Sequence, residues 1–293
     1  MPIDSALVGT STSVHRHDVD ARWTMAFSAA LGDTGPHYLD TTSEVVAHPL
    51  FTIAPEWNVH LEGRDMLAAN GLTPDERLKS VHATHDCHVH RLVRPGDRLE
   101  TRATTVLAEE RRPGAYVVTR LDTTDAKGEP VCTTYQASVY RGVPVAGGDR
   151  VHAEPPPPPA VSGANGGPAP VAEIPVPVPA NLAHVYSECA RIWNPIHTDV
   201  EVARRMGLPD IILHGSATLA LAVSRVVDHA AGGDPNRVRR LGGMFRGMVL
   251  MPSEIRLRVL ADETNDDGRI LAWDVLNAED QPAITKGFVV LAG

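Results

Sequence analysis

The sequence divides into two successive blocks with the same order of predicted elements. In each block, helical segments are followed by strands of alternating polar and apolar residues. In the first block, residues 21–31 and 49–70 carry apolar residues at helical spacing. Strand-like alternation follows, interrupted by turn residues such as those of Arg94-Pro95-Gly96-Asp97. The strands predicted here are residues 81–92, 98–108, 116–125 and 131–140. The first block is therefore expected to be helices followed by an antiparallel meander.

The second block repeats this order. Its longest helix is predicted at residues 216–230, with Ser216 as the N-cap and Gly232 just past the end. Apolar residues cover most of the circumference of this helix, so it should be buried. The other predicted elements are a short helix at 200–206 and strands at 239–249, 254–260, 270–277 and 283–291. An antiparallel sheet wrapped around a central helix suits both blocks and predicts an α+β fold.

A change in composition separates the two blocks. Five consecutive prolines, Pro155 to Pro159, precede a stretch of small and glycine-rich sequence, and such a segment cannot form a core. We therefore predict a first domain at 1–150, a linker at 151–178 and a second domain at 179–293. The two domains are expected to join their sheets or to pack as a pseudo-dimer, because either arrangement protects sheet edges.

Composition and charge narrow the class of protein. The formal net charge of −9 argues against a broad nucleic-acid surface. Cys87, Cys132 and Cys189 are sparse and lack metal-ligand spacing, which fits a reducing compartment without a disulfide framework. Residues 1–20 contain no signal-peptide core, and no apolar run approaches membrane-spanning length. We expect a soluble cytoplasmic protein without metal or cofactor.

Two short segments of the second block carry the chemistry: Asn194-Pro195-Ile196-His197, and Leu213-His214-Gly215 before the long helix. An imidazole has an ordinary pKa of about 6.5, so His197 is a candidate general base. Asn194 could position a water molecule, and the Gly215 N–H at a helix N-terminus could bind a developing oxyanion. The alternatives are structural: His197 and Asn194 fixing a turn, and Gly215 permitting close backbone approach.

These segments resemble the signature of the MaoC-like, (R)-specific enoyl-thioester hydratases, Asp-x-Asn-Pro-x-His followed by Leu-His-Gly. The first 150 residues resemble the N-terminal unit of the two-domain members, through Gly32-Asp33, Pro36 and the run from His90 to Asp97. The resemblance implies a tandem hot-dog fold. It also implies reversible hydration of a trans-2-enoyl thioester of coenzyme A or of a carrier protein. In that reaction His197, Asn194 and Gly215 would act as described above. A second copy of the chain is a further candidate partner.

The chain departs from the family pattern in both halves. Ile192 stands where the family has its catalytic Asp, and it cannot transfer a proton. In the first half Asp33 is present, but Gly35 replaces the Asn and Tyr38 replaces the His. Besides Asp33, the candidates for the missing acid are Glu188, Cys189 and Arg191.

These departures leave other functions open. A non-catalytic acyl-binding or partner protein is one alternative, and another hot-dog enzyme such as a thioesterase or isomerase is a second. His214 is expected to contact substrate or to serve the structure. Arg239 and Arg246 are expected to meet the phosphates of the thioester carrier, because the forked donors of arginine suit phosphate, or else to lie on a solvated strand.

Overall fold

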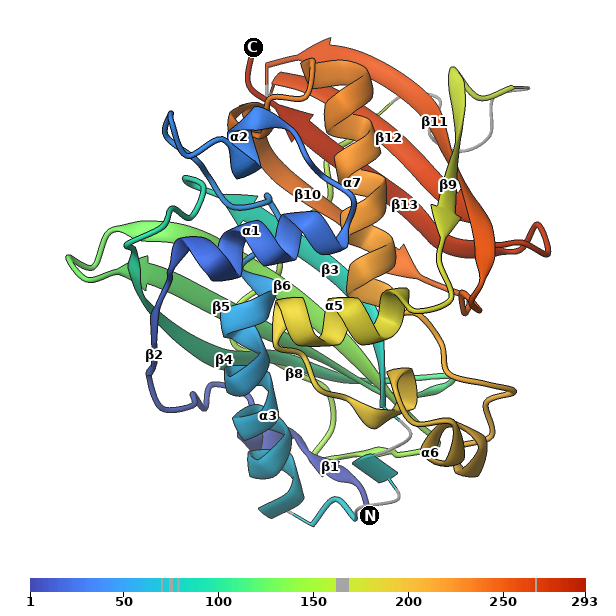
Figure 1. The fold of residues 1–293 in the computed structure, drawn as a ribbon. Coiled ribbons are helices and arrows are strands. Elements are labelled where there is room, and N and C mark those ends of the chain that lie inside the picture. The colour runs from blue at the N-terminus through green and yellow to red at the C-terminus, as the bar shows by residue number, and fades with distance from the viewer. Residues whose placement is uncertain (70, 74–75, 78–79, 162–168, 267) are drawn as a thin grey trace.

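The computed structural model describes residues 1–293 except 70, 74–75, 78–79, 162–168 and 267. Both blocks contribute to one large sheet, whose inner face is covered by helices (Figure 1). Along the sheet the strands follow the order β2-β4-β5-β6-β3-β10-β13-β12-β11-β9, with β8 beside β4, and β1 and β7 form a separate parallel pair. The predicted α+β class and double hot-dog arrangement agree with this architecture.

The strands are β1 (Ile3–Asp4), β2 (His15–Asp18), β3 (Ser80–Val89), β4 (Arg98–Arg111), β5 (Gly114–Asp125), β6 (Pro130–Arg141), β7 (Val145–Ala146), β8 (Arg150–Val151), β9 (Ala172–Val178), β10 (Val238–Phe245), β11 (Ser253–Asn265), β12 (Gly268–Leu276) and β13 (Pro282–Leu291). The helices are α1 (Ala21–Ala30), α2 (Pro36–Leu39), α3 (Ile53–Ala69), α5 (Leu182–Ala190), α6 (Val200–Arg205) and α7 (Gly215–Ala231). Short 3₁₀ turns lie at Ser5–Leu7, Pro195–His197 and Pro235–Arg237.

The two halves contact each other in the sheet and in the layer of helices, and in each layer the neighbouring elements run antiparallel. In the sheet, β3 pairs with β10, and the Arg240 guanidinium binds both oxygens of Asp86 across this junction at 2.8 and 2.6 Å. In the helical layer α1 packs against α5, with the rings of Phe27 and Tyr186 centred 5.6 Å apart (Figure 1). Because equivalent elements pair antiparallel with each other, the halves are related by an approximate twofold.

The long helix α7 is the central helix of the second half, as the pattern predicts. It ends at Gly232, which has the left-handed φ of 64° expected past a helix end. The predicted N-cap is wrong by two residues: His214 holds that position. Ser216 lies inside the first turn, where its buried hydroxyl accepts a hydrogen bond from Tyr186 at 3.2 Å.

The predicted linker contains more structure than its composition indicates. Residues 172–178 form β9, the edge strand of the second half, paired with β11. Proline has no backbone N–H, and Pro175 and Pro177 lie two residues apart, so both positions without a donor fall on the same side of β9. An edge strand tolerates prolines on the side that pairs with no other strand. Upstream, the Pro157 carbonyl accepts a hydrogen bond from Arg240, and Val161 packs on a small cluster formed by Ile270, Phe288 and Val290. Residues 162–168 lie outside the described residues.

One hydrophobic core crosses the junction and includes Phe27 and Leu50 of the first half and Tyr186, Leu219 and Trp273 of the second. Among the described residues, no helix has the length and apolar character needed to cross a membrane.

Candidate active site

The two chemistry-bearing segments of the second half lie together at the N-terminus of α7. After α5, the chain passes through Asn194 and the 3₁₀ turn Pro195–His197, and it returns through Ile212 to His214 and Gly215. The imidazole rings of His197 and His214 stack, with centroids 3.7 Å apart and planes inclined by 26°. Since His214 immediately precedes Gly215, the structure brings His197 beside the start of the helix, as the sequence predicts.

His197 is held as a neutral imidazole with one free nitrogen. Its Nδ1 lies 2.8 Å from the Ile212 carbonyl oxygen, which can only accept, so Nδ1 carries the proton. Burial lowers the pKa of His197 to about 4, and the Ile212 carbonyl opposes this shift. At neutral pH the Nε2 lone pair therefore remains available to take a proton.

His214 packs against the ring of His197. Its Nε2 lies 3.1 Å from the Ser187 hydroxyl of α5, whereas its Nδ1 has no hydrogen-bond partner among the described residues. Burial, and next the neighbouring His197, lower the pKa of His214 well below its ordinary value. Two stacked neutral rings thus form one wall of the site.

The backbone N–H of Gly215 and the side-chain amide of Asn194 form no hydrogen bond with any described residue. Gly215 is the first residue of α7, where a backbone N–H has no intrahelical partner and favours a negative group. The Phe245 ring packs against this glycine. A Cβ atom added to Gly215 would lie only 3.1 Å from Phe245 Cδ1. Asn194 is half-buried, and its side chain makes no capping hydrogen bond. Its own carbonyl accepts from the His197 N–H at 3.1 Å.

Within the described part of the chain, no carboxylate contacts either imidazole of this site. Ile192 is buried, with 4% of its surface exposed, and Glu188 is exposed on α5. Cys189 has its pKa raised by partial burial, and the Arg191 guanidinium stacks on the Trp23 ring at 4.1 Å. Among the described residues of the second half, none therefore replaces the missing acid.

The two predicted phosphate-binding arginines lie at opposite ends of β10. Arg246 follows Phe245, near Gly215, and its side chain is exposed, with Nε 3.1 Å from the Thr285 hydroxyl. Arg239 is also exposed, but it is six positions earlier than Phe245, roughly 20 Å along an extended strand. Its Nη1 donates to the Asn236 carbonyl at 2.6 Å. Only Arg246 thus lies on the side of the candidate site.

The first half contains a cluster that sequence reasoning largely missed. Asp33, one of the candidates for the absent acid, lies with His48, Ser224 and Arg225 instead of with His197. Ser224 and Arg225 belong to the distant α7, so no local spacing signals the contact. One signal in the sequence was that Asp33 stands in the place of Ile192 when the halves are aligned on Pro36 and Pro195.

Several histidines also lie on β3. Simple alternation would place His82 and His85 on opposite faces, but a bulge between His82 and Thr84 intervenes. The rings of His82 and His85 lie 5.5 Å apart, and the ring of His82 lies 4.4 Å from that of Phe245. Among the described residues, no three His, Cys, Asp or Glu side chains gather as metal ligands.

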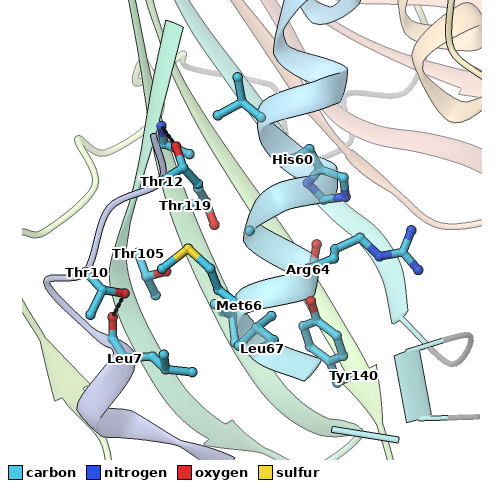
Figure 2. A pocket seen from close by; sticks show the side chains of 15 residues that line it. Leu7, Thr10, Thr12, His60, Arg64, Met66, Leu67, Thr105, Thr119 and Tyr140 are labelled. Atoms are coloured by element: carbon cyan, nitrogen blue, oxygen red, sulfur yellow. Dashed lines mark hydrogen bonds between the residues drawn. The ribbon is translucent and has the colours of Figure 1, made fainter. Parts of the chain in front are cut away.

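A separate recess lies in the first half, between α3 and strands β4 to β6 (Figure 2). It encloses about 540 Å³ when the open space at its mouth is included. Figure 2 shows Met66 reaching from α3 toward Thr105. The remaining lining is rich in hydroxyl groups and includes Thr12, Thr119 and Ser138. His197, Asn194 and Gly215 do not line this recess.

The fold and the site define a double hot-dog protein. Solved structures share this fold at low identity: a MaoC-like dehydratase from Phytophthora capsici matches with a TM-score of 0.82 and 16% identity, over 98% of this chain and 96% of that one. A conserved hypothetical protein from Mycobacterium tuberculosis, described as a double hotdogfold, matches with a TM-score of 0.62 and 16% identity, over 97% of this chain and 96% of that one.

Two family models match separate parts of the sequence. Residues 164–277 match the MaoC like domain, and residues 6–134 match the FAS1-like dehydratase domain region. The second half therefore matches a MaoC-like dehydratase domain, and the first half matches a FAS1-like dehydratase region.

Curated relatives are named as hydratases. Enoyl-CoA hydratase ChsH3 of Mycobacterium tuberculosis is 26% identical over 261 residues, which is 88% of this chain and 82% of that protein. The peroxisomal Enoyl-CoA hydratase 2 of Arabidopsis thaliana is 31% identical over 101 residues, 34% of this chain. That match spans only 31% of the plant protein. The comparisons support a hydratase or dehydratase class.

Proposed function

We propose that the chain is an acyl-thioester hydratase or dehydratase that reversibly adds water to a trans-2-enoyl thioester, giving the (R)-3-hydroxyacyl product. One observation carries the proposal: the ring of a neutral His197, whose Nε2 makes no hydrogen bond to a described residue, stacks on His214, and the next residue, Gly215, begins α7 with an N–H that has no intrahelical partner. A base and an oxyanion donor at one place are what addition of water to an enoyl thioester requires.

The proposed reaction uses these groups in turn. Nε2 of His197 takes a proton from water as the water oxygen bonds to Cβ. The electron pair of the double bond moves through Cα onto the thioester oxygen, which the Gly215 N–H stabilises. Asn194 holds the water through its free amide. In a syn addition both new bonds form on one face, so the same imidazole can return the proton to Cα. This route needs no second acid, which fits the presence of Ile192.

The names of the relatives support a thioester substrate. Hydratases acting on enoyl-CoA are among them, and a fatty acid synthase subunit beta from Aspergillus oryzae matches over 77 residues at 40% identity. Coenzyme A and a carrier-protein arm share a phosphopantetheine group, and we expect the exposed Arg246 to bind its phosphate.

The test is the loss of enoyl absorbance when crotonyl-coenzyme A is mixed with the purified protein. We expect His197→Ala to lower turnover by about 10²–10⁴-fold, the usual effect of removing a general base. His90→Ala, which changes an exposed imidazole of the first half, is the matched control and should leave turnover unchanged. Equal turnover in the wild type and His197→Ala would remove His197 from the mechanism.

A non-catalytic acyl-binding role is the second candidate, and the buried Ile192 at the position of the family acid favours it. Under this role no enoyl thioester is turned over, but acyl-coenzyme A raises the melting temperature, because a ligand that binds only the native state stabilises it.

A further inference from the structure

The first half carries a counterpart of the second-half site. Aligning Pro36 with Pro195 places Asp33 at the position of Ile192 and Tyr38 at that of His197. The ring of Tyr38 stacks with that of His48, inclined by 29° at 6.2 Å, as His197 stacks with His214. Here, unlike in the second half, the acid position holds a carboxylate.

The carboxylate of Asp33 is held by two groups from the other half of the chain. Ser224 Oγ donates to Oδ2 at 2.6 Å, and Arg225 Nη2 donates to Oδ1 at 2.8 Å. Both residues lie on α7, whereas Asp33 follows α1. Only 7% of the surface of Asp33 is exposed, but the side chain of Arg225 is 28% exposed, so the cluster reaches the surface at the arginine.

His48 fixes the direction of the hydrogen bonds in this cluster. Its Nδ1 accepts from the Leu50 N–H at 3.0 Å, so the ring proton is on Nε2. That nitrogen lies 3.1 Å from the Ser224 hydroxyl and 3.8 Å from Asp33 Oδ2. Ser224 therefore accepts from His48 and turns its own proton toward Asp33; the alternative acceptor, the Ala220 carbonyl, is farther away, at 3.0 Å.

Donors beside the carboxylate remain unused by the protein. Arg225 Nε is buried without a partner, and the Tyr38 hydroxyl makes no hydrogen bond to any described residue. Burial, and next the charge of Asp33, raise the pKa of Tyr38, so its hydroxyl stays a donor. A purely structural ion pair would need neither group. Together they could hold a carbonyl oxygen next to a proton-transfer carboxylate.

We propose that Asp33, Tyr38, His48, Ser224 and Arg225 form a second acid–base site. In this site the Asp33 carboxylate exchanges a proton with the carbon next to an acyl-thioester carbonyl. The C–H bond breaks, its proton joins a carboxylate oxygen, and its electron pair becomes an enolate on the carbonyl oxygen, which Arg225 or Tyr38 stabilises. The reverse step returns the proton, and no other reactant is consumed. The choice of thioester rests on the proposed function, but the chemistry does not involve His197.

The surroundings favour a base that works near neutral pH. Burial raises the pKa of Asp33 to about 6, against the opposing effects of Ser224 and Arg225. Burial lowers the pKa of His48 to about 3, so this imidazole stays neutral. The charged and titratable groups that face the carboxylate are Arg225 and Asp228 from α7, His48 from the segment before α3, and Tyr38 from α2. Exchange should therefore rise with pH through about 6 as Asp33 loses its proton.

The experiment follows deuterium entering Cα of butyryl-coenzyme A in D₂O by proton NMR. A saturated thioester cannot be hydrated, but His197 is proposed to move a proton at Cα, so all rates are measured in a His197→Ala background. We expect Asp33→Asn to lower the enzymatic exchange rate by about 10²–10⁴-fold. The matched control is Asp274→Asn, which alters a similarly buried carboxylate paired with Arg258 at 2.6 Å but not with an imidazole.

A second variant keeps the test decisive if Asp33→Asn does not fold. Ser224→Ala removes a hydrogen bond to the carboxylate, so the pH midpoint of exchange should move upward. A merely structural role would change the melting temperature without moving this midpoint. Absence of exchange in His197→Ala, exchange that persists when Asp33→Asn is added to it, or an unmoved midpoint when Ser224→Ala is added to it would each overturn the proposal. Failure of crotonyl-coenzyme A hydration would instead count only against the proposed function.

Discussion

At the scale of single residues, the two halves keep complementary parts of one acid–base pair. The second half retains the imidazole of His197 and has Ile192 in place of the acid. The first half retains Asp33, and its imidazole comes from His48 because Tyr38 stands in the other place. These differences lie at equivalent positions of a repeated arrangement, so each can be tested by restoring what the other half has.

Restoring the acid to the second half gives a direct prediction. Ile192→Asp should raise crotonyl-coenzyme A hydration at least about 10-fold, since general acid help is typically worth 10²–10⁴. Burial at this position will keep the new carboxyl protonated and able to donate. The rate is measured by enoyl absorbance, and stability by urea unfolding, where a loss of about 2–4 kcal/mol is expected.

Ile192→Asn is the matched control, because it adds a polar group of similar shape that cannot transfer a proton. An equal rise in both variants would show that polarity, and not acid catalysis, causes the change.

At the scale of elements, the pair α1 and α5 holds the helical layer together. Phe27 of α1 is fully buried between three rings from two other segments, Phe51, Tyr186 and His48, whose centroids lie 5.5, 5.6 and 5.7 Å away. Since this ring contacts both halves, its packing contributes to the position of both candidate sites.

We expect Phe27→Ala to lower the free energy of unfolding by about 3–5 kcal/mol, because it leaves a cavity in a close-packed core. Urea unfolding followed by circular dichroism measures the change. Trp193→Ala is the control; this ring is 59% exposed, so its loss should stay within about 0.5 kcal/mol. A loss below about 1 kcal/mol for Phe27→Ala would mean that the interface between the helices repacks around the cavity.

The sequence predicts the elements well where one face is buried and the other is solvated. All eight strands expected from alternation exist, and the four expected helices exist with shifted ends. The sequence prediction is wrong for β9. The prolines of this segment suggest a linker, although an edge strand can contain them. The helix α5 was not predicted, although Leu182, Ala183, Tyr186 and Ala190 lie on one buried face at helical spacing.

The candidate site was predictable only where its parts are close in sequence. His197, His214 and Gly215 fall within one motif, and the structure places them together. The contacts of Asp33 with Ser224 and Arg225 join residues 191 and 192 positions apart. Such contacts depend on how the halves pack, which local spacing does not encode.

At the scale of the whole molecule, an unusual number of histidines is buried in the neutral form. Burial lowers the pKa of His48 and His60 to about 3 and that of His82 and His197 to about 4. In the unfolded chain each titrates near 6.5, so below that pH the unfolded state binds more protons than the native state. Stability is therefore complete above pH 6.5 and falls progressively as the pH drops toward 4.

We expect the free energy of unfolding to fall by at least about 1 kcal/mol per pH unit between pH 6.5 and 4.5, since one pKa unit corresponds to 1.36 kcal/mol for each group. Asp33 and Glu56 act in the opposite direction, because burial raises their pKa values, but they are fewer. Urea titrations at several pH values measure the slope. A flat or rising stability over this range would contradict the prediction.

Joining both units in one polypeptide has a consequence for how this molecule can evolve. In an assembly of identical subunits, any substitution appears twice, so both catalytic centres are altered at once. Here positions 33 and 192 are encoded separately although they occupy equivalent places. Selection can thus remove an acid from one centre while preserving it in the other, and a duplicated fold becomes a scaffold for two unequal chemistries.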